Sequence, residues 1–413
     1  MSAIVMVGLG GAGGKAVDAA ARMVYATGAT TSACDFVAVD ADKPALTSLL
    51  HCRRIEIGAG RFEGMGFKGD QIGAANALSD YLSDHPGEIF GAARIAVIAV
   101  GLGKGGAGAM ARLLKLAASR NIATFCILTR PFGFEGEKVA FAAEQALQRI
   151  EIEGDCHCRF IIDNDDLVEI PIPLGAGDAG EGDGDAGGAG GTDVSTVPGA
   201  FRRASAVLAE WISLFWKMTA LQGYLNIPDG TLADTLRRGA GLCHLGYASA
   251  SGHYRSRNAM REIRGRGGVA LSEARYKAAQ GALVAIIGGA DMMMREISEV
   301  MNGFEHAFNK ETFERVRMGT VVEPNAGGTL RVVAMLFEEW RDNMEYEEDA
   351  EEPAAAAAGG AAVPSARTIA RPKKRGSFPF KSSKFDKSVA SIYKGENLDK
   401  PAFIRRQLNI DLN

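Results

Sequence analysis

Residues 97–109 read VIAVGLGKGGAGA, and this stretch decides the fold. A run of β-branched and small apolar residues, typical of a fully buried strand, ends in a loop with five glycines, and an apolar helical pattern follows at once. Glycines let backbone N–H groups converge on one point without a Cβ in the way, and such a nest before a helix N-terminus attracts phosphate. The stretch therefore predicts a nucleotide at the carboxyl end of a buried strand.

Length, composition and charge bound the class of protein. With 413 residues, 47% of them hydrophobic, the chain is long enough for two domains and too apolar for wholesale disorder. A net charge of −4 is too small to favour a nucleic acid or a membrane surface as partner. No apolar stretch reaches about 18 residues, and the N-terminus begins a strand without a basic leader, so we expect neither a membrane span nor a signal peptide.

The six cysteines are scattered and form no disulfide framework, which favours a reducing cytoplasm. Cys156, His157 and Cys158 stand together in the sequence. Three ligands at this spacing make a poor metal site, and we expect the three side chains to pack without a metal. The cysteines therefore predict a cytoplasmic protein with no metal site of its own.

Strand and helix patterns alternate over residues 1–170. The apolar runs predict strands at 4–7, 36–39, 95–100, 124–128 and 160–162, and the helical periodicity predicts helices at 15–25, 70–84, 109–119 and 137–151. This alternation predicts an α/β fold with a Rossmann-like parallel sheet that helices cover on both faces. Ligands of such sheets bind beyond the carboxyl ends of the strands, where the glycine segments lie.

The rest of the chain divides by composition. An acidic, glycine-rich stretch predicts a disordered insert, a helical apolar stripe that includes Phe201 predicts a buried central helix, and a charged Ala/Pro-rich stretch predicts a disordered linker. The expected boundaries are a nucleotide domain at 1–199 with its insert at 175–191, a central helix at 200–222, a smaller α/β domain at 223–340, a linker at 341–395 and a docking peptide at 396–413. Within the smaller domain we expect strands at 282–287, 319–322 and 330–336, and a solvated basic face at 255–268.

A second glycine segment opens the chain. Residues 8–13 read GLGGAG, which fits the G-x-G-x-x-G pattern of dinucleotide sites, and Asp40 and Asp42 follow the next predicted strand. Alone, this pattern favours an NAD(P)-dependent oxidoreductase. Two phosphate nests on neighbouring strand ends suit a nucleoside polyphosphate better, so the oxidoreductase stays as a remote alternative.

Taken together, the motifs resemble the FtsZ family, the bacterial tubulin homologues that form the division ring, over nearly the whole chain. The segments at 8–16, 39–42 (VDAD), 64–69 (GMGFKG), 103–108, 129–136 (TRPFGFEG) and 164–165 resemble the family's nucleotide loops. GALVAIIGGAD at 281–291 resembles a core strand of its C-terminal domain. LDKPAFIRR at 398–406 resembles its C-terminal peptide, which docks on membrane tethers such as FtsA.

The resemblance implies a tubulin/FtsZ-like fold and a GTP-binding, GTP-hydrolysing filament protein of cell division. It implies that GTP or GDP, with Mg²⁺, lies between subunits of a head-to-tail homopolymer at the division site near the inner membrane. It assigns to the nucleotide Gly10, Gly11, Gly13, Lys15, Asp42, Gly66, Lys68, Gly103, Lys104, Gly105, Gly106, Ala107, Gly108, Glu135, Asn164 and Ser205. It assigns to partner docking Leu398, Asp399, Pro401, Phe403, Ile404, Arg405 and Arg406.

The sequence departs from the family around the phosphates. The loop at 103–108 is one residue short and lacks two threonines, Lys104 is gained, and an arginine of the family aligns with Val139. Lys15 replaces an asparagine, and Ser205 replaces the asparagine that reads guanine. An ammonium beside a phosphate nest acts as the lysine of P-loop NTPases does, so Lys15 and Lys104 either restore the lost charge or point into solvent.

The catalytic loop of the family carries an asparagine and two aspartates that activate water across the subunit interface. Here Asn226 and Asp229 correspond to the first two, Leu232 stands at the third, and Asp234 is a possible substitute. A carboxylate has to come within about 3 Å of the water that it polarises. Two hypotheses therefore stay open: a slow GTP hydrolase, or an FtsZ paralogue that binds nucleotide with little or no turnover.

Overall fold

The computed structural model describes residues 3–27, 34–169, 196–221, 223–265, 270–323 and 326–342, together with two short strands, β11 (Ile392–Tyr393) and β12 (Glu396–Asn397). Residues 1–346 form one compact unit and residues 347–413 a second. The predicted insert at 175–191 and the docking residues at 398–406 lie outside the described residues, as does nearly all of the predicted linker.

One ten-stranded sheet runs through the first unit in the order β3-β2-β1-β4-β5-β6-β7-β10-β8-β9. Its strands are β1 (Ile4–Leu9), β2 (Asp35–Asp40), β3 (Arg53–Glu56), β4 (Ile95–Gly101), β5 (Ala123–Arg130), β6 (Cys158–Asp163), β7 (Gly239–Ser251), β8 (Gly281–Gly288), β9 (Val316–Val322) and β10 (Thr329–Trp340). β3 through β7 pair in parallel, whereas β10 is antiparallel to both of its neighbours. The carboxyl ends of β1, β4, β5 and β6 therefore meet at one edge of the sheet.

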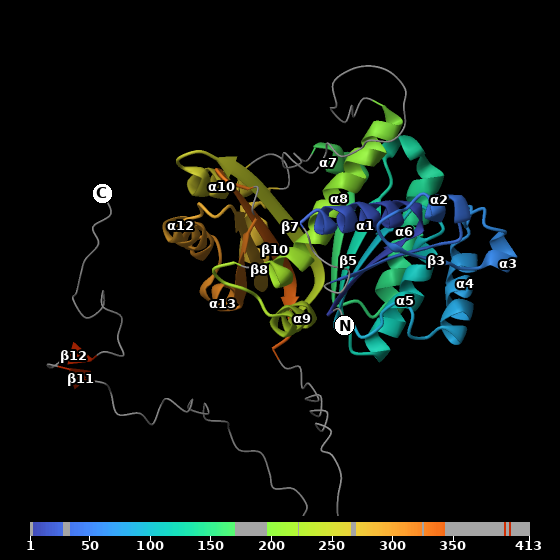
Figure 1. Cartoon of the computed structure of the whole chain (residues 1–413), viewed down its shortest axis with the longest axis horizontal. Helices are drawn as coiled ribbons and strands as arrows, with labels where there is room; N and C mark the ends of the chain where they lie inside the picture. Colours follow the sequence, from blue (N-terminus) through green and yellow to red (C-terminus); the bar gives the residue numbers. More distant parts are fainter. Residues whose placement is uncertain are drawn as a thin grey trace, which may run out of the picture. The chain divides into compact units, whose positions relative to one another are not determined.

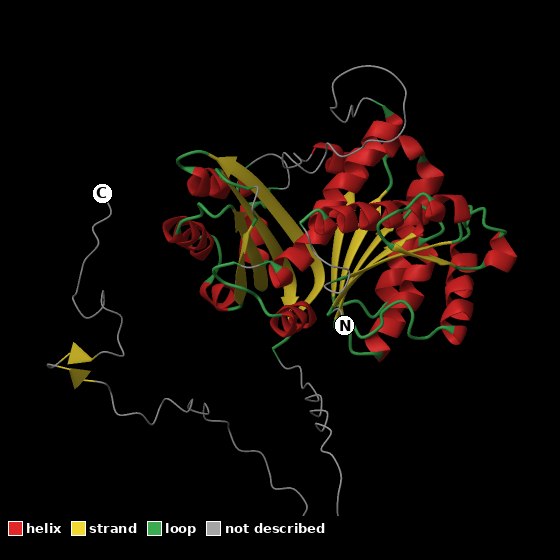
Figure 2. Ribbon diagram, viewed as in Figure 1, coloured by secondary structure: helices red, strands yellow, loops and turns green. Residues whose placement is uncertain are grey.

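Helices cover both faces of the parallel part (Figures 1 and 2). Ile4 and Met6 of β1 point into a core with α1 (Gly10–Tyr25) and α8 (Val197–Ala220), whereas Val5 and Val7 point into a core with α4 (Gln71–Asp84), α5 (Ala107–Ser119) and α6 (Glu137–Glu153). Alternate residues of a strand face opposite sides, so a strand that is apolar throughout requires both layers. The apolar run at 95–100 is buried in this way.

The second half of the sheet carries its own core. α10 (Arg255–Ile263), α11 (Glu273–Ala278) and α12 (Met294–Glu305) pack on the inner strands β8 and β10. The remaining helices of this unit are α2 (Lys43–Thr47), α3 (Ala59–Phe62), η1 (Gly133–Glu135), α7 (Asn164–Glu169), α9 (Asp229–Arg238) and α13 (Lys310–Glu314). The long helix α8 lies between the two halves, with buried side chains around most of its circumference.

Two strands of the ten-stranded sheet, β3 and β7, are not among the strands predicted from the sequence. β3 reads RRIE, and an edge strand with three charged residues lacks the apolar run that marks a strand. β7 is rich in glycine, alanine and serine, and pairs with β6 and β10 on its two sides. The strand is long because it pairs with two neighbours. The residue pattern of the segment alone gives no sign of these partners.

The first helix begins earlier than expected. α1 starts at Gly10 instead of Lys15, so the glycine segment forms the end of β1 and the first turn of the helix. A Cβ on Gly13 would lie 2.2 Å from the carbonyl oxygen of Ala99 in β4. The glycines therefore allow the helix to start in direct contact with the strand.

The sequence predicts a solvated basic face at 255–268. This prediction is wrong for Arg255. Arg255 is buried and pairs with Glu296 at 2.7 Å and with Asp291 at 2.6 Å, and the Glu296 carboxylate raises the pKa of the guanidinium. Its carboxylate partners come from residues 36 and 41 positions away, which a local charge count does not reveal. Arg257 and Arg261 are exposed as expected.

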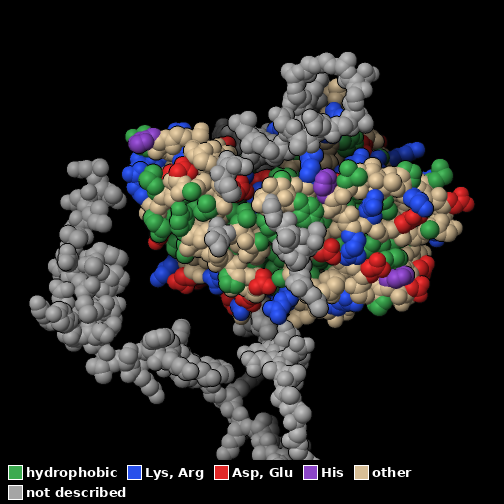
Figure 3. Space-filling view, viewed as in Figure 1, with side chains coloured by type: hydrophobic (Ala, Val, Ile, Leu, Met, Phe, Trp, Pro, Cys, Tyr) green, Lys and Arg blue, Asp and Glu red, His purple; other side chains and the backbone are tan. Residues whose placement is uncertain are grey.

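Lys and Arg side chains are interspersed with Asp and Glu on the face seen in Figure 3. This mixture agrees with the small net charge of −4. In the part of the chain that the structure describes, no helix is long and apolar enough to cross a membrane.

Candidate functional site

A pocket opens at the carboxyl edge of β4 and β5. It is bordered by the first turn of α1, the loop after β4, the turn η1, the start of α7 and the N-terminal half of α8. The lining residues are Ala12, Gly101, Leu102, Gly103, Lys104, Thr129, Pro131, Glu135, Asn164, Phe201, Ala204, Ser205 and Leu208. Five of them, Gly103, Lys104, Glu135, Asn164 and Ser205, were predicted from the sequence.

The two glycine segments meet beside this pocket. A Cβ on Gly106 would lie 2.9 Å from the Cα of Gly10, and one on Gly105 would lie 2.2 Å from the Cβ of Phe67. A Cβ on Gly108 would lie 1.8 Å from the carbonyl oxygen of Gln71. At such distances no side chain fits at these three positions. Because they are glycines, the N-termini of helices α1 and α5 can come together at one point. Converging N-terminal N–H groups carry partial positive charge and favour an anion.

One ion pair spans the pocket. The Nζ of Lys104 lies 2.8 Å from Oε2 of Glu135, and Oε1 of Glu135 accepts the backbone N–H of Phe132 at 3.1 Å. Glu135 is thereby fixed in η1, while Lys104 extends from the loop between β4 and α5. Lys104 therefore points across the site and not away from it.

The remaining predicted nucleotide residues are not among those that line this pocket. Gly10, Gly11 and Lys15 line a separate small pocket on the far side of the first turn of α1, together with Asp40. Burial raises the pKa of Asp40, although the N–H groups of Ala41 and Asp42 oppose this shift. Lys15 therefore lies beside a carboxyl group in this structure.

The predicted third loop lies next to the second. Asp42 caps α2 by accepting the N–H of Ala45 at 2.8 Å, and its side chain lies under Gly66, which has φ +74°. Lys68 is exposed and also has a positive φ, of +50°. These three residues come together, whereas Ala107 and Gly108 are buried in the first turn of α5.

Phe201 is a pocket residue that sequence reasoning assigned to the core. It is 38% exposed and forms an edge-to-face pair with Phe132 at 5.0 Å, while Phe132 and Phe134 stack. Phe201, Ala204, Ser205 and Leu208 share one face of α8 by their three- and four-residue spacing. The apolar stripe contained this signal, but the stripe alone did not separate a core face from a pocket wall.

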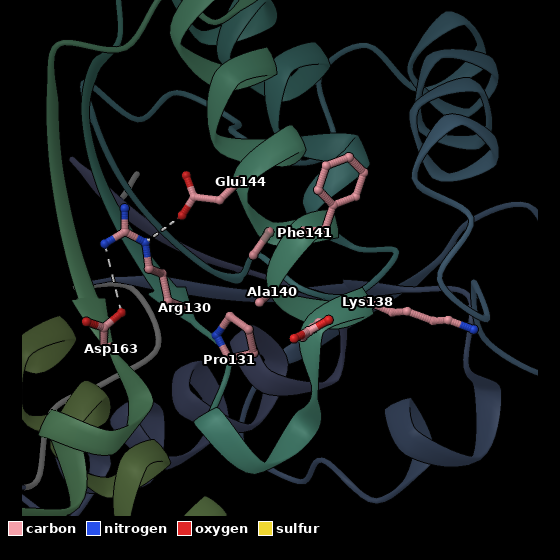
Figure 4. A pocket seen from close by; sticks show the side chains of 9 residues that line it. Arg130, Pro131, Lys138, Ala140, Phe141, Glu144 and Asp163 are labelled. Carbon is pink, nitrogen blue, oxygen red and sulfur yellow. Dashed lines mark ion pairs between the residues drawn. The ribbon is translucent and has the colours of Figure 1, made fainter.

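A larger cleft of about 700 Å³ lies between Pro131, α6 and the end of β6 (Figure 4). Its guanidinium, Arg130, already pairs with Glu144 at 3.1 Å and with Asp163 at 3.9 Å. No residue of either glycine segment lines this cleft. The exposed ring of Phe141 forms part of its wall. Because its guanidinium is already paired and neither glycine segment reaches it, this cleft is a poorer site for phosphate than the glycine-bordered pocket.

The three catalytic candidates lie elsewhere. Asn226 is exposed, and its Oδ1 accepts the N–H of Gly223 at 2.9 Å; Asp229 is the first residue of α9. Asp234 lies five residues further along α9, so it points about 140° away from Asp229 at 3.6 residues per turn. It is also paired with Arg238 at 2.8 Å, and Leu232 is fully buried. The structure brings Asn226 and Asp229 to one end of α9 and does not bring Asp234 to them.

The glycine-bordered pocket and these candidates lie at opposite ends of the parallel strands. Ser205 and the end of α8 at Ala220 are 15 residues apart, which is about 22 Å along a helix. Arg237 of α9 donates to the carbonyl oxygen of Asn121, which precedes β5, so α9 lies at the amino ends of the strands. Figure 1 shows α7 and α9 near the two ends of α8. Within one chain, Asp229 cannot reach a ligand of the pocket.

The Cys156–Cys158 segment packs between strands. The Sγ atoms of Cys126 and Cys156 are 3.0 Å apart, and the Nδ1 of His157 accepts the N–H of Thr124 at 3.3 Å. Cys158 is buried against the end of α9. In the part of the chain that the structure describes, no three His, Cys, Asp or Glu side chains form a group that could hold a metal ion.

The fold and the site define a class: a protein with a parallel sheet, a glycine-bordered pocket at the carboxyl edge of its strands, and the loop with Asn226 and Asp229 at the opposite edge. Two family models match the chain. The Tubulin/FtsZ family GTPase domain matches residues 3–171, and the FtsZ family C-terminal domain matches residues 241–337. The chain belongs to the tubulin/FtsZ family of GTPases, and the nucleotide that its GTPase domain takes is GTP or GDP. This assignment disfavours the oxidoreductase hypothesis.

Similar proteins with curated names are division proteins. A cell division protein FtsZ of Azotobacter vinelandii is 27% identical over 415 residues, which cover 98% of this chain and 96% of that protein. Cell division protein FtsZ 2 of Rhizobium meliloti is 27% identical over 330 residues, which cover 80% of this chain and 86% of that protein. The similarity thus extends over both domains.

Solved structures share the fold. The empty FtsZ dimer of M. jannaschii superposes with a TM-score of 0.67 at 20% identity and covers 82% of this chain and 88% of that one. A CetZ2 protofilament of Haloferax volcanii with bound GTPγS has a TM-score of 0.60 at 24% identity, with coverage of 81% and 92%. At this identity the likeness establishes the tubulin/FtsZ fold.

Proposed function

We propose that this chain assembles head to tail into filaments of the cell-division ring and hydrolyses GTP at each subunit interface. One observation carries the proposal: the pocket and the loop with Asn226 and Asp229 lie at opposite ends of the sheet. Neither end is a complete active site. A second copy that stacks its loop end on the pocket of the first supplies the missing half, and because this contact does not close by rotation, it repeats into an open filament.

The proposed nucleotide lies with its phosphates at the glycine segments and its base on α8. The N–H groups at Gly10, Gly11 and Gly13 and at Gly103, Gly105 and Gly106 take the phosphates. Gly108, whose N–H donates to the carbonyl oxygen of Gly105 at 2.9 Å, allows the close packing of α5 that brings them there. Asn164 lies near the ribose, and Ser205 and the ring of Phe201 contact the base. Asp42, Gly66 and Lys68 are near the terminal phosphate.

Magnesium fits this proposal as an ion held by phosphate oxygens and water. Mg²⁺ usually keeps several waters and binds through substrate phosphates, so it does not require a cage of protein ligands. This agrees with the described residues, which contain no cluster of three His, Cys, Asp or Glu side chains that would hold an ion alone. Bound in this way, the ion neutralises charge that develops on the phosphates.

The proposed hydrolytic residues are Asn226 and Asp229 of the neighbouring subunit. Both are accessible at the start of α9, where a carboxylate can orient water toward an incoming phosphate. Asp234 is engaged by Arg238 and is not proposed as their substitute. With one acidic group at this end of α9, we expect slow turnover.

The C-terminal residues 398–406 complete the proposal. Their resemblance to the docking peptide of the family supports a contact with membrane-tether proteins such as FtsA through Leu398, Pro401, Phe403 and the arginine pair. Such a contact would hold the filament at the division site on the inner membrane. Deletion of 398–406 is expected to leave GTP turnover intact and to abolish co-sedimentation with a tether on vesicles.

Asp229→Ala and Asp234→Ala form a matched pair of variants that tests the hydrolytic step. We expect GTP-dependent filaments to sediment with both variants, and phosphate release to fall at least about 100-fold in Asp229→Ala only. Equal turnover in the two variants would contradict the role of Asp229. Filaments without any phosphate release in the wild type would instead support a nucleotide-binding paralogue, and the absence of filaments with GTP would overturn the filament itself.

A further inference from the structure

The two side chains of the Lys104–Glu135 ion pair differ strongly in their exposure to solvent. The Lys104 side chain is 66% exposed, whereas that of Glu135 is 9% exposed and is held by the N–H of Phe132. Glu135 is therefore a fixed, nearly buried carboxylate. Lys104 is a long side chain on a glycine-rich loop, and it can turn toward another anion without disturbing the core.

Lys104 is the sole basic side chain among the residues that line the pocket in the described chain. On the neighbouring helix α6, Val139 presents a methyl group to the loop, so close that a Cβ on Gly103 would meet it at 2.4 Å. Lys15 belongs to the separate pocket beside Asp40. Of the residues that line the pocket, Lys104 alone therefore offers an ammonium to a phosphate, and in this structure Glu135 engages that ammonium.

We propose that Lys104 and Glu135 form a latch that makes the pocket selective for phosphorylated ligands, a proposal that rests on the nucleotide site proposed above. When a nucleotide enters, Lys104 moves from Glu135 to the phosphates. Glu135 is then free to accept hydrogen bonds from the ribose hydroxyls. Phosphate and ribose are thus recognised together.

The latch follows from the cost of an unpaired buried charge. A nearly buried carboxylate that loses its partner costs free energy unless new donors replace it, and the ribose hydroxyls are such donors. The phosphates compensate Lys104 at the same time, since their multiple charge attracts the ammonium more strongly than one carboxylate does. A nucleoside brings the hydroxyls without the phosphates, so Lys104 stays on Glu135 and competes with the ribose.

Binding of GTP, GDP and guanosine to the full-length protein tests the latch, by competition against a fluorescent GDP analogue with EDTA present to exclude Mg²⁺. We expect Lys104→Met to weaken GTP and GDP about 10- to 100-fold, the range for a hydrogen bond to a charged group. Guanosine is expected to bind the variant as tightly as the wild type or more tightly, because Glu135 is released. Lys104→Arg should restore most of the affinity for GTP.

Lys115→Met is the matched control, because Lys115 forms an ion pair with Glu153 on the outer face of the same domain. It should leave all three affinities unchanged. An equal loss for GTP and guanosine in Lys104→Met would mean a merely structural lysine, and an unchanged affinity for GTP would also overturn the latch. Failure of the wild type to bind GTP would overturn the proposed nucleotide site itself, which separates the two conclusions.

Discussion

His157 illustrates how one side chain takes its properties from its neighbours. Its Nδ1 accepts the N–H of Thr124, and its own backbone N–H donates to the Thr124 hydroxyl at 3.0 Å. Burial, together with the positive charge of Arg237, lowers the pKa of His157 to about 4. The neutral ring is therefore the form that fits between β5 and β6.

This pKa shift predicts a loss of stability in mild acid. The unfolded chain binds a proton at His157 below about pH 6.5, while the folded chain resists it down to about pH 4, so the free energy of unfolding falls as the pH drops through this window. The contribution of His157 should fall by about 2 kcal/mol between about pH 7.5 and pH 5. Urea unfolding of the wild type and of His157→Asn, which keeps an acceptor without a titration, measures this difference. Parallel pH profiles of the two proteins would refute the expectation.

Phe201 and Phe141 distinguish the glycine-bordered pocket from the larger cleft. Phe201 lines the first and Phe141 the second, and both rings are partly exposed. Stacking of a base on an aromatic ring contributes about 1–3 kcal/mol, so Phe201→Ala should weaken GTP binding by about 5-fold or more. Phe141→Ala should leave the dissociation constant for GTP unchanged, as measured by the same nucleotide competition. The opposite pattern would move the nucleotide to the larger cleft.

At the scale of elements, α8 joins the two halves of the sheet through buried charges. Glu210 accepts from Lys217 at 3.1 Å and from Arg331 of β10 at 2.8 Å, and both cations also pair with Glu323. Burial alone would raise the pKa of Glu323, but Lys217 and Arg331 hold it below its ordinary value. The helix is thus fixed to the second half of the sheet by a closed set of opposite charges.

Breaking this set should be costly. Glu210→Gln leaves two buried cations short of negative charge, and removal of one partner of a buried pair costs about 3–5 kcal/mol. We expect a markedly lower urea midpoint, with the slope of the transition unchanged. Glu273→Gln breaks the exposed pair with Lys277 and is the control, since surface pairs contribute little. Similar midpoints for the two variants would show that the buried charges do not hold α8.

At the scale of the whole molecule, the proposed function makes catalysis a property of two subunits, because the pocket and the loop lie far apart in one chain. A mixture of two inactive variants tests this directly. Asp229→Ala keeps the pocket and loses the loop, whereas Ala12→Trp fills the pocket at the first turn of α1 and keeps the loop. In a randomly mixed head-to-tail filament, about a quarter of the interfaces combine one intact pocket with one intact loop.

We therefore expect each variant alone to be nearly inactive and the equal mixture to regain GTP turnover, up to about a quarter of the wild-type rate per subunit. Phosphate release at filament-forming concentration measures it. A mixture no more active than its components would mean that the two ends do not complete each other. Turnover in Asp229→Ala alone would mean that the loop is not needed.

Much of the fold could be predicted because its signals are local. The buried run at 95–100 and the glycines after it needed only their own residue types to predict a central strand and a phosphate loop. β3 and β7 could not be predicted in this way. They are strands because they pair with neighbouring strands, and their own composition does not indicate it. Phe201 was assigned to the core because an apolar stripe on a helix looks the same beside a core and beside a pocket.

The sequence by itself determined the class of sheet, the two glycine segments and the family to which the motifs belong, because each of these depends on residues close together in the chain. Only the tertiary structure decided that Lys104 forms an ion pair with Glu135 across the pocket, that Arg255 is buried, and that Asp234 forms an ion pair with Arg238. It also separated the pocket from Asp229 by the length of α8. Distances between segments arise from packing, and no local pattern of residues specifies them.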